Sequence, residues 1–76
     1  MLKTIYDMTI GEEGKIIDIA IKDKQINHRF IDLGIAPYAK IMLLNKFNFN
    51  NLYIIQVDDV EICIRRKDAK LIKVEV

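Results

Sequence analysis

The stretch RFIDLGIAP, at residues 29–37, interrupts a chain that otherwise has the residue pattern of β-strands. Phe30 and Leu33 are spaced to share one face of a helix. Gly34 stands where a left-handed residue would end that helix, and Pro37 prevents the helix from continuing. The stretch therefore predicts a short helix inserted in a β domain, with one face on the core and the other toward solvent.

We expect this helix to span residues 24–33, because Asp23 is a suitable N-cap and Ile26 continues the apolar face of Phe30 and Leu33. A helix of this length is marginal without packing, so its apolar face is expected to cover one end of the β structure. On this basis Leu33→Asp should unfold the domain, since it would bury a charge.

Apolar residues recur at alternate positions in five other segments, as in short strands. These segments are residues 16–21, 41–47, 53–57, 60–64 and 72–76. Ile16 is out of step with the rest of the first segment, which indicates either a bulge near Asp18 or a strand that is buried on both faces. In the second segment, Phe47 has the same parity as Ile41 and Leu43.

The connections between these segments are short. Val57 and Val60 flank Asp58 and Asp59 as in a two-residue hairpin, because aspartate tolerates the positive φ that such turns require. The residues therefore predict a mainly β fold, a small five-stranded barrel with one short helix after the first strand. Closure into a barrel would also protect the edges of strands so rich in isoleucine.

Composition limits the classes of function. The chain has 76 residues, which fits a single domain over residues 1–76. Domains of this size are marginally stable, so docking on a partner or a homo-oligomer stays open. The 12 basic and 11 acidic residues are mixed along the chain and leave a formal net charge of +1, which argues against nucleic-acid binding.

Cys63 is the only cysteine, so no internal disulfide can form and a reducing compartment is expected. The first residues lack the apolar core of a signal peptide, and no apolar run approaches the roughly 18 residues of a membrane span. We therefore expect a cytoplasmic protein without direct membrane insertion.

No catalytic, cofactor or metal site is predicted, and an enzyme is not expected. His28 and Cys63 are the only soft ligands, and neither has a second one at ligand spacing. His28 is expected to face solvent, and Cys63 to be a small filler in its strand. The acidic residues of the hairpin should point outward and apart, and the basic run at residues 65–67 should be a solvated turn. Tyr38 is a candidate exposed aromatic on a loop.

Three motifs together resemble the FeoA family, which belongs to the bacterial ferrous iron transport system. They are Gly11, Gly14, Ile16 and Ile19 near the start, RFIDLGIAP, and Ile62-Cys63-Ile64-Arg65 followed by Asp68-Ala69 and Ile72-x-Val74. The resemblance covers nearly the whole chain. It implies an SH3-like β-barrel and a non-enzymatic accessory role beside the membrane transporter FeoB, whose cytoplasmic part binds GTP.

The same SH3-like domain forms the C-terminal module of iron- and manganese-dependent repressors, so a stand-alone metal-responsive regulatory domain is the alternative. A direct Fe²⁺ carrier is a third interpretation, for which the ligands are few. The partner-binding face expected for the adaptor consists of His28, Arg29, Asp32, Pro37 and Tyr38.

The chain departs from the family pattern at two turns. Tyr38 stands where relatives usually have glycine after the proline, which would either alter the tight turn or add an aromatic contact. The connection at residues 48–52 replaces a Gly-x-Pro pattern, and Asn50 is a candidate for the left-handed residue there.

Overall fold

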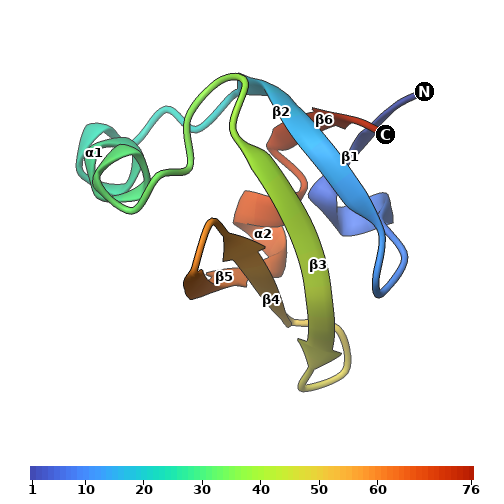
Figure 1. Ribbon diagram of the computed structural model, residues 1–76. Coiled ribbons are helices and arrows are strands. Elements are labelled where there is room, and N and C mark those ends of the chain that lie inside the picture. The colour runs from blue at the N-terminus through green and yellow to red at the C-terminus, as the bar shows by residue number, and fades with distance from the viewer.

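The computed structural model describes residues 1–76 and shows a mainly β fold, as predicted (Figure 1). In chain order the elements are β1 (Leu2–Thr4), η1 (Ile5–Asp7, a 3₁₀ turn), β2 (Glu13–Ile19), α1 (Lys24–Asp32), β3 (Lys40–Phe47), β4 (Leu52–Val57), β5 (Val60–Arg65), α2 (Arg66–Ala69) and β6 (Ile72–Glu75). The six strands form one antiparallel sheet in the order β1-β6-β2-β3-β4-β5. The sheet is strongly curved and roughly barrel-like, but it is not closed, because β1 and β5 remain its two edges.

The sequence predicted five strands, and β1 is the sixth. Its three residues are too few for an alternation to be recognised, and its pairing depends on the far end of the chain. Leu2 is opposite Glu75 in β6, and the Met1 amino group donates a hydrogen bond to the Val76 carbonyl at 3.0 Å. The two termini therefore lie side by side, as Figure 1 shows.

One core cluster of apolar side chains fills the concave side of the sheet. It draws on alternate residues of the strands, because successive side chains of a strand point to opposite faces. In β4 and β5 the buried members are Tyr53, Ile55, Val57, Ile62 and Ile64. The alternation predicted for residues 53–57 is confirmed, whereas Val60 at the start of β5 is exposed.

Two irregularities bend the strands. The pairing of β2 with β6 shifts register between Ile16 and Asp18, which confirms the bulge predicted there. A second shift, between Leu43 and Asn45 in the pairing of β3 with β4, was not predicted. It reverses the parity of the rest of β3, so Phe47 is half-exposed and does not share the buried side of Leu43.

Helix α1 begins and ends for local reasons. The Asp23 carboxylate accepts hydrogen bonds from the backbone N–H groups of Gln25 at 2.9 Å and Ile26 at 3.3 Å, so the predicted N-cap is confirmed. Gly34 follows the helix with a φ of +95°, and a Cβ there would also lie 3.3 Å from Val57 Cγ1. Glycine thus suits both the left-handed turn and the close approach to β4.

The apolar face of α1 differs from the predicted one. Phe30 is 6% exposed and packs in the core, but Leu33 is 38% exposed. The helix ends at Asp32, so the chain leaves the helical path at Leu33, and Ile35 beyond the glycine is the next fully buried residue. Leu33→Asp is therefore not expected to bury a charge, which corrects the expectation from helical spacing.

Glu12 should make stability depend on acid pH. Its carboxylate accepts hydrogen bonds from the Thr9 N–H at 3.0 Å and from Lys3 Nζ at 3.3 Å. The Thr9 N–H, with a smaller contribution from Lys3, holds the Glu12 pKa below its usual 4.5. A carboxyl whose pKa is lowered in the folded state adds stability above its unfolded pKa, and that stability is lost as the pH falls through the folded pKa.

We therefore expect Glu12→Gln to lower the free energy of unfolding at neutral pH and to flatten its decrease in acid. Urea denaturation at a series of pH values measures this. Glu13→Gln is the matched control, because Glu13 is exposed and forms no ion pair. Equal pH profiles for the two variants would contradict the assignment to Glu12.

Candidate functional site

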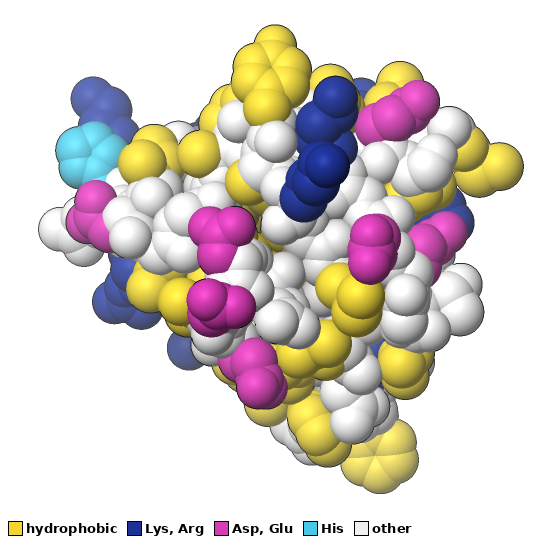
Figure 2. Space-filling model, viewed as in Figure 1, with side chains coloured by type: hydrophobic (Ala, Val, Ile, Leu, Met, Phe, Trp, Pro, Cys, Tyr) yellow, Lys and Arg dark blue, Asp and Glu magenta, His cyan; other side chains and the backbone are white.

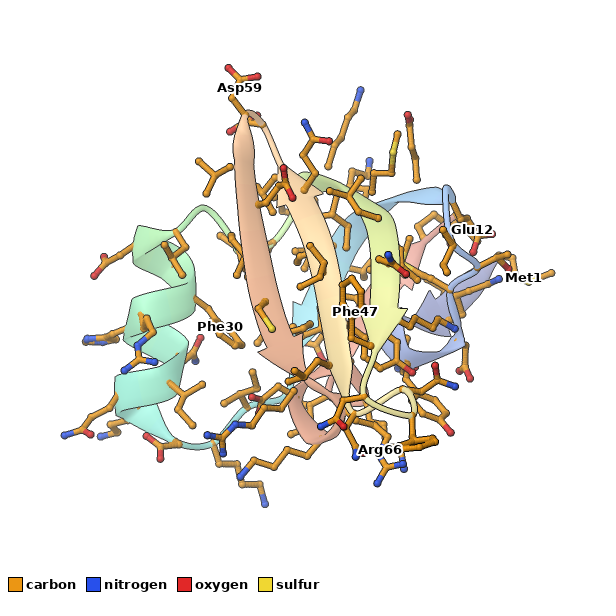
Figure 3. All side chains as sticks on the ribbon, turned by 90° about the horizontal axis from the view of Figure 1, so that it is seen from below. Met1, Glu12, Phe30, Phe47, Asp59 and Arg66 are labelled. Carbon is orange, nitrogen blue, oxygen red and sulfur yellow. The ribbon has the colours of Figure 1, made fainter.

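Helix α1 lies beside the sheet and not on top of it. Figure 1 shows it at one side of the molecule, joined to β2 and β3 by two extended connections. Of its nine residues only Phe30 is buried, and Figure 3 shows that side chain pointing from the helix toward the strands. Most of the helix surface is therefore free to contact another molecule.

A groove of about 190 Å³ lies between α1 on one side and β5 with α2 on the other. Its apolar lining comes from Ile26 and Phe30 of the helix and Ile64 of β5, and its cations are Arg29, Arg65 and Lys67. None of these cations forms an ion pair, since the only pairs in the structure are Met1–Glu75 and Lys3–Glu12. We call this feature the α1–β5 groove.

The α1–β5 groove combines an apolar floor with a positive rim. The groove has one carboxylate, that of Asp68, against three cations. Asp68 is buried whereas the cations are exposed, so the charge at the surface of the groove is positive. Such a groove suits an anionic side chain that is flanked by apolar ones. It is small, and Cys63 completes its lining.

The residues predicted to bind a partner occupy different parts of this side of the molecule. His28, Arg29 and Asp32 are all exposed on α1. At about 100° per residue, Arg29 lies next to the inward-facing side of the helix, and it is the one predicted residue that lines the α1–β5 groove. His28 and Asp32 share the outer face.

Pro37 and Tyr38 form a corner between α1 and β3, where both are exposed. The Tyr38 N–H donates a hydrogen bond to the Ile16 carbonyl at 2.6 Å, and Ile16 returns one to Ala39 at 2.8 Å. The corner is thus tied to β2, and the tight turn is kept although glycine is absent.

Tyr38 keeps this turn with a φ of +73°. A left-handed conformation costs a non-glycine residue roughly 1–2 kcal/mol. Tyr38 is 73% exposed, so packing inside the protein offsets little of this cost. Strained residues with no internal contacts are candidates for contact with a partner.

The remaining candidate ligands are dispersed. His28 is exposed, as expected, but Cys63 is exposed and not a buried filler. Strand β5 is an edge with Ile62 and Ile64 turned inward, so the side chain of Cys63 points outward and lines the α1–β5 groove. The acidic residues of the β4–β5 hairpin are exposed, with Asp59 at its tip (Figure 3). No three His, Cys, Asp or Glu side chains converge on one point.

Arg65 and Lys67 were missed as site residues. Their basic run was noticed in the sequence, but it was interpreted as a solvated turn. Only the tertiary structure shows that the end of β5 and the start of α2 place these cations in one groove with Arg29, which is more than thirty positions earlier.

Comparisons with known proteins agree with this architecture. The FeoA domain model matches residues 3–76. The chain belongs to the FeoA family. This family of SH3-like domains is linked to ferrous iron transport and is not a known family of enzymes. No curated protein sequence matches the chain.

Solved structures of the family have the same fold. The FeoA protein of Chlorobium tepidum is 19% identical with a TM-score of 0.91, covering 97% of this chain and 70% of that one. The zinc complex of Stenotrophomonas maltophilia FeoA, described as a prokaryotic SH3 domain protein, is 16% identical with a TM-score of 0.78 and coverage of 96% and 89%. The structure is therefore an SH3-like fold.

Repressors share this fold as one part of a longer chain. IdeR of T. acidophilum is 21% identical with a TM-score of 0.84, and the match covers 99% of this FeoA chain but 34% of IdeR. The likeness concerns the fold alone.

No helix of this chain has the length and apolar composition required to cross a membrane.

Proposed function

We propose that this protein is a cytoplasmic, non-enzymatic accessory protein of ferrous iron transport that docks on the GTP-binding cytoplasmic part of a FeoB-type transporter. Membership of the FeoA family supports the link to iron transport. The observation that carries the docking proposal is helix α1, which has one buried residue and borders a groove with three unpaired cations. An exposed free thiol at Cys63 is compatible with a reducing compartment.

In this proposal the α1–β5 groove receives an acidic segment of the partner. Arg29 contributes most to affinity, because it lies at the boundary between the apolar floor and solvent. Tyr38 adds an aromatic contact at the neighbouring corner with Pro37. His28 and Asp32, on the outer face of the helix, orient the partner more than they hold it.

No observation gives the repressor-type regulatory domain a comparable argument. Its support is the shared fold, and the chain corresponds to about a third of the repressor's length. The groove and the exposed corner, in contrast, are features of this chain itself.

Titration of the purified cytoplasmic domain of the transporter, with GDP and with a GTP analogue, tests the proposal. We expect binding in at least one nucleotide state, and we expect Arg29→Glu to weaken it about tenfold or more. Lys24→Glu is the matched control, since it makes the same charge change on the same helix at an exposed position outside the groove. Absence of binding in every nucleotide state, or equal losses for both variants, would refute the proposal.

Tyr38→Gly separates docking from folding. Glycine adopts a φ of +73° without steric cost, so the free energy of unfolding should stay the same or rise by up to about 1 kcal/mol. Docking should nevertheless weaken, because the exposed ring is lost. Calorimetry of unfolding and the same titration measure the two effects, and undiminished docking would remove Tyr38 from the interface.

A further inference from the structure

The turn between β3 and β4 holds an aromatic side chain almost wholly in solvent. Asn48, Phe49 and Asn50 all have positive φ, at 56°, 57° and 64°, and Phe49 is 96% exposed. Asparagine adopts this conformation readily, but a bulky residue does so at a cost. Phe49 therefore accepts an unfavourable backbone conformation without burying any surface inside the protein.

Backbone hydrogen bonds connect the turn to its surroundings. The Asn51 N–H donates to the carbonyls of Phe47 and Asn48, both at 3.1 Å, and the Arg66 N–H donates to the Asn51 carbonyl at 2.8 Å. The turn is thereby tied to the beginning of α2. Figure 3 shows Arg66 beside it, and Figure 2 shows a hydrophobic side chain projecting at the end of the molecule where Figure 1 places the turn.

Cations lie beside this turn. Arg65, Arg66 and Lys67 line a shallow hollow of about 300 Å³ whose other wall is Asn51 and Leu52 of the turn. None of the three forms an ion pair. Asp68, next in sequence, is buried, so it offers little negative charge at the surface.

Two lysines extend the positive surface. Lys46 Nζ lies 5.4 Å from the centroid of the Tyr53 ring, and Lys70 Nζ lies 4.8 Å from that of Tyr6. The centroids of the Tyr53 and Tyr6 rings are 6.1 Å apart, so the two lysines contact one aromatic pair. The nearby acid is Asp7, whose carboxylate accepts a hydrogen bond from Thr4 Oγ1 at 3.2 Å. We call the set of Lys46, Phe49, Arg65, Arg66, Lys67 and Lys70 the basic turn surface.

We propose that the basic turn surface adsorbs to an anionic lipid bilayer, with the Phe49 ring at the level of the headgroups and the cations facing the lipid phosphates. A single projecting aromatic beside a cluster of unpaired cations supplies the apolar anchor and the charge that a flat anionic interface requires. Nucleic acid would instead need several aromatic platforms along a groove, whereas Phe49 is the single aromatic of the basic turn surface. Adsorption needs no spanning segment and no residue of α1, which lies at another side of the molecule (Figure 1), but Arg65 and Lys67 belong to both the basic turn surface and the α1–β5 groove.

The chain contains no tryptophan, so Phe49→Trp introduces a single fluorescent reporter. We expect its emission to shift to shorter wavelength when vesicles of phosphatidylcholine and phosphatidylglycerol are added, and the shift to disappear with neutral phosphatidylcholine vesicles or at high salt. Tyr38→Trp is the matched control, because it is another exposed aromatic with positive φ, and its emission should not change. No shift for Phe49→Trp, or equal shifts for both variants, would overturn the proposal.

Cosedimentation with the same vesicles tests the charges. The double variant Arg66→Glu/Lys67→Glu should bind at least about tenfold more weakly. Lys22→Glu/Lys24→Glu carries the same charge change at two exposed positions, just before α1 and at its first residue, and should bind the vesicles almost as well as the unmodified protein. Far-ultraviolet circular dichroism confirms that each variant is folded. Equal losses for the two double variants, or tighter binding of the unmodified protein to a single-stranded oligonucleotide than to the vesicles, would overturn the lipid assignment.

Discussion

Tyr53→Ala is expected to lower the free energy of unfolding by about 3–5 kcal/mol. A chain of this length has about 4–11 kcal/mol in total, so the variant should be largely unfolded at moderate urea concentrations. Tyr53 is 1% exposed on β4, between β3 and β5, and its ring lies beside that of Tyr6. Removal of the ring leaves a cavity that the surrounding strands cannot close without losing their register. Urea denaturation followed by circular dichroism measures the loss.

Tyr53→Phe is the control for packing. It keeps the ring and removes the hydroxyl, which donates a hydrogen bond to the Tyr6 carbonyl at 3.3 Å. The expected loss is about 0.5–1.5 kcal/mol. Burial raises the pKa of Tyr53, so the hydroxyl is a neutral donor at physiological pH. If Tyr53→Phe lowered the free energy of unfolding as much as Tyr53→Ala, the hydrogen bond and not the packing of the ring would account for the stabilisation by Tyr53.

Phe30→Asp is expected to have the other large effect, a loss of about 4 kcal/mol or more. The substitution empties a core position and places a charge at a residue that is only 6% exposed. Leu33→Asp should cost only about 1 kcal/mol, because the charge stays hydrated at a site that is 38% exposed. Urea denaturation of both variants measures the difference.

Ile31→Asp completes this series as a control, since Ile31 is half-exposed on the same helix. It should behave like Leu33→Asp. A loss at Leu33 as large as that at Phe30 would show that Leu33 is covered in solution, and a dependence of that loss on protein concentration would identify a second copy as the cover.

Several features of this fold follow from neighbouring residues and could be predicted from the sequence. Asp23 caps α1 because its carboxylate reaches N–H groups two and three residues ahead. Gly34 ends the helix because a positive φ is easiest for glycine, and Asp58 permits the β4–β5 hairpin for a related reason. The bulge before Asp18 was visible as a break in alternation. Each of these depends on interactions within a few positions along the chain.

Other features depend on which segments meet. The shift after Leu43 turns Phe47 outward, although the strand pattern around it is regular. Tyr38 retains the conformation of a glycine because hydrogen bonds to Ile16 hold the corner, so its residue type alone would not have shown the turn.

The candidate surfaces depend on the same long-range contacts. Arg29 shares a groove with Arg65 and Lys67 only because the fold brings α1 opposite the end of β5 and the start of α2. The turn that carries Phe49 gains its cations because the Arg66 backbone is bonded to Asn51. The sequence by itself therefore determined the longer strands, helix α1 with its cap, and the family. The tertiary structure decided which apolar residues are covered and which charges converge, because burial and electrostatic potential depend on the spatial neighbours of a side chain and not on its neighbours in the chain.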